Sequence, residues 1–166
     1  MALSAYGSRN NKYYKIIKNM IDLGSDGSFE LNQSYFKQHN LTMPNFYTDN
    51  FVKLLGNPKQ KNEKFTRKDY EIASAMQQVF EDICFHMLRY LYNKTKIKNL
   101  VLSGGSFMNS VFNGKAEKFS PFNNVWLSSC PDDSGQSIGA ALYLYNNILK
   151  KKNRYELKHN YLGPGY

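Results

Sequence analysis

The 166-residue sequence has little cysteine, a single tryptophan and no long hydrophobic run. Its two cysteines, Cys84 and Cys130, have no metal-ligand spacing and cannot make the framework of a disulfide-stapled fold. No apolar stretch approaches the ~20 residues that span a bilayer. The first residues also lack the charged and apolar regions of a signal peptide. We therefore expect a protein of the reducing cytoplasm with no membrane partner.

Acidic residues are also scarce: 13 stand against 22 basic ones, for a formal net charge of +9. Basic surfaces attract nucleic-acid backbones. Here, however, the lysines gather at 59–68, 94–98 and 150–154, which the pattern places in loops or at helix ends. No arginine-rich arm, zinc finger or RNA-recognition motif accompanies them. The pattern favours a solvated lysine-rich surface over nucleic-acid binding.

The most informative stretch is residues 99–115, where a short apolar run meets two glycines and then apolar residues at helical spacing. It predicts a buried strand, a turn at Gly104 and Gly105, and a helix over 106–119. This order aims backbone N–H groups at an anion, and a helix N-terminus adds about half a positive charge. The expected anion is a phosphate. The alternative is that the glycines only allow a tight turn.

A second strand is predicted over 124–128, followed by a polar loop at 130–135 and a helix over about 136–151. If both strands share a sheet, the helix between them makes a right-handed parallel crossover. The fold class is then α/β, with parallel strands and helices on both faces. Loops 103–106 and 131–135 would leave the same carboxyl edge, where ligands bind in open α/β sheets. This coincidence favours the phosphate hypothesis.

The first part of the chain predicts small elements around one long helix. Residues 1–11 read as a loop, 13–23 as an amphipathic helix ended by a glycine, and 29–36 as two small strands or a hairpin. Residues 37–65 are an irregular excursion with at most one short helix, near 50–55.

The strongest helix is predicted to begin at Thr66, which forms a capping box with Asp69. Its apolar residues recur at intervals of three and four and predict one buried face: Ile72, Met76, Val79, Ile83, Met87 and Leu91. Cys84 and His86 are two residues apart and so face different sides of this helix. They are interpreted as packing or surface residues.

Several segments share the order of a known family. Residues 102–109, Leu-Ser-Gly-Gly-Ser-Phe-Met-Asn, are followed by Asn-Gly-Lys at 113–115. Residues 131–142 carry Asp-Asp-Ser-Gly and then Gly-Ala-Ala, and residues 1–7 read Met-Ala-Leu-Ser-Ala-Tyr-Gly. Together they resemble segments of the NodU/CmcH-type O-carbamoyltransferases, and residues 26–29 and 162–164 also fit. The shared order is more specific than any single match.

The resemblance implies a single partial domain over 1–166, the C-terminal portion of the family's large domain. That domain has an actin/hexokinase/chaperone-ATPase-like, ribonuclease H-like fold. The family makes carbamoyl-adenylate from ATP and carbamoyl phosphate in a YrdC-like domain. The large domain then transfers the carbamoyl group to the hydroxyl of a small-molecule acceptor. An iron-type divalent metal ion, or alternatively magnesium, takes part. The implied partners are this acceptor and the rest of the same polypeptide, its N-terminal half and YrdC-like domain.

By matching position, the resemblance implies nucleotide contacts from five residues: Ser103, Gly104, Gly105, Asn109 and Gly135. It implies that Asp133 is a metal ligand. A carboxylate oxygen suits a cation that bridges phosphate oxygens. From the residues alone, a helix N-cap is the alternative role for Asp133. No catalytic residue is assigned.

The sequence also departs from the family. The triplet at 106–108, Ser-Phe-Met, replaces a small Val-Ala sequence and predicts a bulkier turn. The family's metal-binding His-x-x-x-His pattern has no match, because His39, His86 and His159 are scattered. The first phosphate-binding hairpin and the YrdC-like domain are not matched either. We therefore expect no turnover by this chain alone. The alternative function is a non-catalytic nucleotide-binding or scaffold module.

Overall fold

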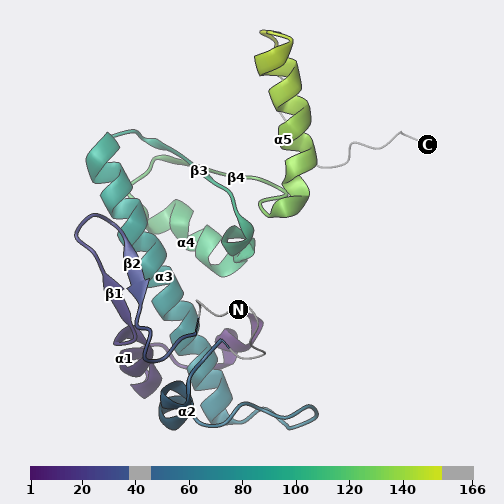
Figure 1. Cartoon of the computed structure of the whole chain (residues 1–166). Helices are drawn as coiled ribbons and strands as arrows, with labels where there is room; N and C mark the ends of the chain where they lie inside the picture. The colour runs from purple at the N-terminus through teal and green to yellow at the C-terminus, as the bar shows by residue number, and fades with distance from the viewer. Residues whose placement is uncertain (38–45, 155–166) are drawn as a thin grey trace. The chain divides into compact units, whose positions relative to one another are not determined.

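A computed structural model describes residues 1–37 and 46–154 (Figure 1). Helices dominate, and the strands form two separate pairs, one antiparallel and one parallel, which confirms a mixed α/β class. The chain divides into two compact units. Unit 1 comprises Met1–Ile97 and Phe119–Pro121, and unit 2 comprises Lys98–Lys118 and Phe122–Tyr166. In the described ranges, every helix is too short or too polar to cross a membrane. The single partial domain stays a prediction.

Unit 1 is built on the long helix α3, Arg67–Thr95 (Figure 1). The Asp69 carboxylate accepts hydrogen bonds from the Thr66 backbone N–H at 2.6 Å and from the Thr66 hydroxyl at 2.7 Å. The backbone bond is one half of the predicted capping box, and the other half, from the Asp69 backbone N–H to the Thr66 hydroxyl oxygen, is also present, so the capping box is confirmed. At the other end, Lys96 adopts a left-handed φ of 57° and ends the helix.

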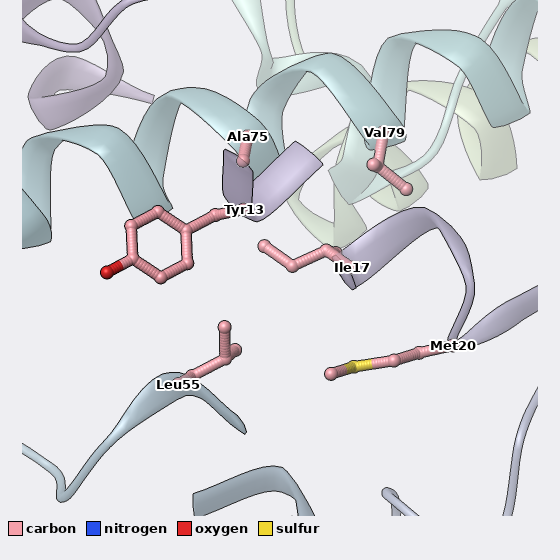
Figure 2. Close-up of a cluster of buried hydrophobic side chains, with 6 residues drawn as sticks. All are labelled: Tyr13, Ile17, Met20, Leu55, Ala75 and Val79. Carbon is pink, nitrogen blue, oxygen red and sulfur yellow. The ribbon is translucent and has the colours of Figure 1, made fainter. Parts of the chain in front are cut away.

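The core of unit 1 lies where α1, Lys12–Lys18, and α2, Asp49–Leu55, meet α3. Figure 2 shows the side chains that converge there: Tyr13, Ile17, Met20, Leu55, Ala75 and Val79. Ile17 and Met20 are each only 1% exposed. Burial of each such aliphatic side chain stabilises the fold by about 1.5–3 kcal/mol.

The predicted apolar face of α3 is only partly buried. Val79 is buried and Ile72 packs against the core, but Met76, Met87 and Leu91 are 41–45% exposed. The apolar stripe is wider than the surface that α1 and α2 cover. Another side of the helix, which carries Ser74, Gln77, Gln78 and Glu81, is buried instead.

That polar side of α3 is buried under residues 1–11. Ala2–Tyr6 forms a short 3-10 helix, where a loop was predicted. The guanidinium of Arg9 lies 3.0 Å from the Glu81 carboxylate, whose side chain is 3% exposed. Asn10 and Gln78 exchange two hydrogen bonds, at 2.9 Å and 2.6 Å. Since buried polar groups need such partners, these bonds hold the first segment on the helix.

The helix predicted over 13–23 is wrong at its end, because α1 stops at Lys18. Strand β1, Ile21–Leu23, follows and pairs antiparallel with β2, Phe29–Leu31. The turn between them uses Gly27 at a φ of +80°, a conformation that favours glycine. Near Phe36, where a second small strand was predicted, the described residues form an isolated antiparallel bridge between Phe36 and Tyr47. Of the predicted excursion at 37–65, residues 38–45 lie outside the described ranges.

Unit 2 contains the predicted parallel pair. Strands β3, Asn99–Leu102, and β4, Asn124–Leu127, lie in parallel register, with Leu102 opposite Leu127. Helix α4, Ser110–Phe119, connects them (Figure 1). The buried residues of the unit alternate along β3 and come from α4 and the chain after it: Leu100, Leu102, Phe112, Ala116 and Phe122. The confirmed pairing places the ends of both strands at one edge.

Both predicted helices of unit 2 are interrupted. Instead of one helix from 106, a 3-10 turn over Gly105–Met108 precedes α4. After β4, helix α5 spans Gln136–Tyr143 and continues as one π-helical turn over Leu144–Ile148, short of the predicted end at 151. Val101 and Trp126, opposite each other in register, are 64% and 55% exposed. Helices on both faces of the sheet stay a prediction.

We expect R9M to lower the free energy of unfolding by about 2 kcal/mol, less than the ~3–5 kcal/mol for a fully buried pair because Arg9 is half exposed. The variant leaves the Glu81 carboxylate buried without its cation. E81Q removes that charge, so the double variant should lose less than the sum of the two single variants. Urea unfolding measures all three. The control is K18M, which breaks the Lys18–Asp82 pair, whose carboxylate side chain is 36% exposed; a loss as large as that of R9M would contradict the role of burial.

Candidate functional site

The two polar loops predicted to lie together do so in the structure. The Gly104 backbone N–H donates to the Pro131 carbonyl oxygen at 2.5 Å. The Ser103 hydroxyl donates to the same oxygen at 3.4 Å. A Cβ built on Gly105 would lie 4.0 Å from the Asp132 Cβ. Loops 103–106 and 131–135 therefore form one surface at the carboxyl edge of β3 and β4, the edge where open α/β sheets bind ligands.

The two glycines of the first loop serve different needs. Gly104 has a φ of +110°, which an L side chain rarely adopts. Gly105 has no such constraint, and a side chain there would meet open space short of Asp132. Gly104 is thus required by the turn, whereas Gly105 leaves the backbone open to close approach by a ligand.

Asn109 joins the 3-10 turn to α4. Its side-chain oxygen accepts a hydrogen bond from the Phe112 backbone N–H at 3.1 Å, and its backbone carbonyl accepts from Asn113 N–H at 3.0 Å. The residue therefore caps the helix, which is a common role for asparagine. Its implied nucleotide contact stays a prediction.

Asp133 is exposed and begins the 3-10 turn Asp133–Gly135. One carboxylate oxygen lies 3.4 Å from the Gln136 side-chain amide, which donates to it. The alternative role of N-cap is wrong for Asp133, because Asp132 precedes the turn and Gly135 precedes α5. Asp132 instead accepts a 2.5 Å hydrogen bond from the Ser134 hydroxyl. The Asp133 carboxylate is thus exposed to solvent in the second loop, two residues after Pro131, which accepts the hydrogen bond from the first loop.

A metal ion would find few protein ligands here. Among residues 1–37 and 46–154, no three His, Cys, Asp or Glu side chains come together to hold one. His86 is in unit 1, where a ring nitrogen lies 2.9 Å from the Gly24 carbonyl, while His39 and His159 fall outside the described ranges. One exposed carboxylate fits a cation held mainly by phosphate and water, as Mg²⁺ is. It does not complete an iron site.

Gly135 is enclosed by its own loop. A Cβ there would overlap the Cys130 carbonyl oxygen, and the Gly135 N–H donates to the Asp132 carbonyl at 3.0 Å. Glycine is therefore required by close packing of the backbone. A nucleotide contact from Gly135 stays a prediction.

The interpretation of Cys84 as a packing residue is confirmed. The side chain is buried, and burial together with the nearby Glu81 charge raises the pKa of its thiol to about 11. Because the thiolate is the reactive form, this cysteine is inert near neutral pH.

Sequence reasoning missed Asn113 as a residue that shapes the first loop. Its side-chain N–H donates to the Phe107 carbonyl at 2.7 Å. The Phe107 ring packs against Phe112, with ring centroids 5.9 Å apart. The bulk predicted for this turn is thus anchored on α4. No signal in the sequence marked this bond, because Asn113 and Phe107 are six residues apart and on different elements.

Comparisons with known proteins give one family and several relatives. Residues 1–142 match the family model described as "Carbamoyltransferase N-terminus". An uncharacterized protein of Synechocystis is 33% identical over all of this chain and 27% of its own length. One from Methanocaldococcus jannaschii is 28% identical over 99% of this chain and 25% of its own length. Nodulation protein NolNO of Sinorhizobium fredii is 32% identical over 64% of the chain and 16% of its own. The chain spans about a quarter of the first two.

The three loop glycines should respond differently to alanine. G104A should lose about 1 kcal/mol of stability because of its positive φ, and G135A about 1–3 kcal/mol because its Cβ overlaps a backbone oxygen. G105A should be neutral or gain up to about 1 kcal/mol, since its site is open. Urea unfolding of the three variants measures this order. If G105A proves the least stable, the described geometry of the loop is incorrect.

Proposed function

This chain belongs to the carbamoyltransferase family, and on that premise we propose that it supplies nucleotide-phosphate and metal contacts for carbamoyl transfer. In this proposal the carbamoyl group passes from carbamoyl-adenylate to the hydroxyl of a small-molecule acceptor. The reaction requires a polypeptide of about the relatives' length, because other parts of that polypeptide make the carbamoyl-adenylate. The family match over residues 1–142 supports the transfer, and the paired loops support the contacts.

The observation that carries the proposal is the junction of the two loops. The first internal hydrogen bond of the turn is donated by Phe107 to the Gly104 carbonyl at 2.9 Å, so the N–H groups of Gly105 and Ser106 precede it. Such N–H groups suit a phosphate. The exposed Asp133 carboxylate, in the neighbouring loop, suits a cation that bridges phosphate oxygens.

In the proposed reaction the acceptor hydroxyl oxygen bonds to the carbamoyl carbon, the bond from that carbon to the adenylate phosphate oxygen breaks to release AMP, and the hydroxyl proton passes to water. Negative charge then grows on the leaving phosphate, where backbone N–H groups stabilise it. Residues that fix the nucleotide also hold the reacting carbon in place, which supplies much of the rate. A bound divalent cation would add further charge stabilisation.

The proposal extends to fold, partners and location. The β3–α4–β4–α5 order and its parallel pair support part of an actin/hexokinase/chaperone-ATPase-like domain. The relatives' length supports a role for further parts of the same polypeptide as partners. The proposed location is the cytoplasm, because the reaction uses ATP.

A non-catalytic nucleotide-binding or scaffold module is the second candidate. Its support is the junction of the two loops, which a nucleotide-binding module needs as much as an enzyme does. This module would bind nucleotide through the same loops but transfer nothing. Carbamoyl transfer by a polypeptide of the relatives' length separates the two functions.

G105V should weaken ATP binding at least about tenfold, the range of a misplaced polar contact, while the chain stays folded. The valine would stand in the open space between Gly105 and Asp132 and block close approach by a phosphate. Isothermal titration calorimetry with ATP measures the affinity. The matched control is G139V on α5, where a side chain also meets open space. Unchanged affinity in G105V would move the phosphate site elsewhere.

D133N should abolish metal-dependent carbamoyl transfer in a polypeptide of the relatives' length, because an amide is a far weaker cation ligand than a carboxylate. The fold should be kept, since Asp133 is exposed. Transfer is assayed over a titration of the metal ion, with circular dichroism as the check on folding. E117Q makes the same charge change at an exposed position of α4 and should keep activity. Full activity in D133N would end the metal assignment.

A further inference from the structure

The turn of the first loop is tied down at both of its ends. At its start, the Gly104 N–H donates to Pro131 of the second loop at 2.5 Å. At its far end, the Phe107 carbonyl accepts the Asn113 side-chain N–H at 2.7 Å, and the Phe107 ring packs on Phe112, which is fully buried. The N–H groups of Gly105 and Ser106 lie between these two anchors.

The anchor from Asn113 comes with a feature that stability alone does not explain. The side-chain oxygen of Asn113 is buried and has no hydrogen-bond partner in the part of the chain that the structure describes. A buried acceptor without a donor is destabilising, and native proteins contain few of them. A leucine of similar volume would fill the space without this penalty. We therefore attribute the presence of an amide at this position to its N–H group, which donates to the Phe107 carbonyl oxygen.

A fixed Phe107 carbonyl has a direct effect on the turn. The peptide plane after Phe107 cannot rotate while its oxygen is bonded to α4, and the Phe107 N–H closes the turn on the Gly104 carbonyl at 2.9 Å. The directions of the two N–H groups between the anchors are then set before any ligand arrives. Donors held in this way bind without paying the entropy of ordering the loop.

We propose that Asn113 is a positioning residue for the nucleotide site: it fixes the 104–107 turn from α4 without touching the phosphate. This inference deepens the proposed function and rests on it for the identity of the ligand. It concerns one side-chain bond, between Asn113 Nδ2 and the Phe107 oxygen.

Two substitutions separate the donor from the acceptor. N113D keeps the size and the acceptor oxygens, removes the donor when ionised and adds a negative charge, whereas N113L removes donor and acceptor without adding a charge. N146A is the matched control, because Asn146 donates to the Leu142 carbonyl at 3.0 Å in the same unit but away from the loops. Hydrogen exchange of the 166-residue chain, resolved for residues 104–108, reports the order of the turn without any ligand. Exchange at Leu102 and Ala116, both buried, reports whether the unit stays folded.

We expect N113D and N113L to speed exchange at 104–108 by about threefold to tenfold, the value of one hydrogen bond, with exchange at the buried reporters unchanged. Calorimetry should show ATP affinity weakened by a similar factor in both. N113L should also resist urea at least as well as N113D, because it removes the unpartnered oxygen. A residue that only stabilised α4 would change urea resistance and loop exchange together.

Unchanged exchange at 104–108 in both variants would overturn the inference, and so would faster exchange with unchanged ATP affinity. Effects of the same size in N146A would also overturn it. Failure of the unaltered chain to bind ATP is a different result. It would contradict the proposed function, while the exchange measurement would still decide whether Asn113 holds the turn.

Discussion

Parallel hydrogen bonding between β3 and β4 determines where every candidate site residue of unit 2 lies. With Leu102 opposite Leu127, both strands end at the same edge, and the loops that follow come within one hydrogen bond of each other. Shifting the register by one residue would turn Leu100 and Leu102 away from the covered face. Burial of Leu100 and Leu102 therefore fixes the register of the two strands, and this register brings the two loops into contact.

The meeting of the two polar loops could be predicted because it follows from simple rules of strand order and turn chemistry. An apolar run, a glycine pair and a second apolar run predicted two parallel strands with their loops at one edge, and the capping box at Thr66 marked the start of α3 to the residue. These features depend on residues close in sequence. The positive φ of Gly104 is of the same kind, since the turn itself demands it.

Features that depend on distant contacts could not be predicted. The buried side of α3 is polar because Asn10 and Arg9 reach Gln78 and Glu81 from about seventy residues away, and hydrophobic periodicity is blind to such pairs. Strand β1 continued the helical pattern of α1 and needed its partner β2 to exist at all. Asn113 looked like any helical asparagine until its bond to Phe107 was seen.

Trp126 gives unit 2 an optical label of its own. It is the single tryptophan of the sequence, it lies one residue before the end of β4, and it is 55% exposed. Tryptophan fluorescence excited at the long-wavelength edge of the protein absorption band therefore comes from Trp126 in β4, and unit 1 contributes none of it. Any polypeptide or ligand that covers the open face of the β3–β4 pair will change the colour of the emission, which makes this face observable without a probe.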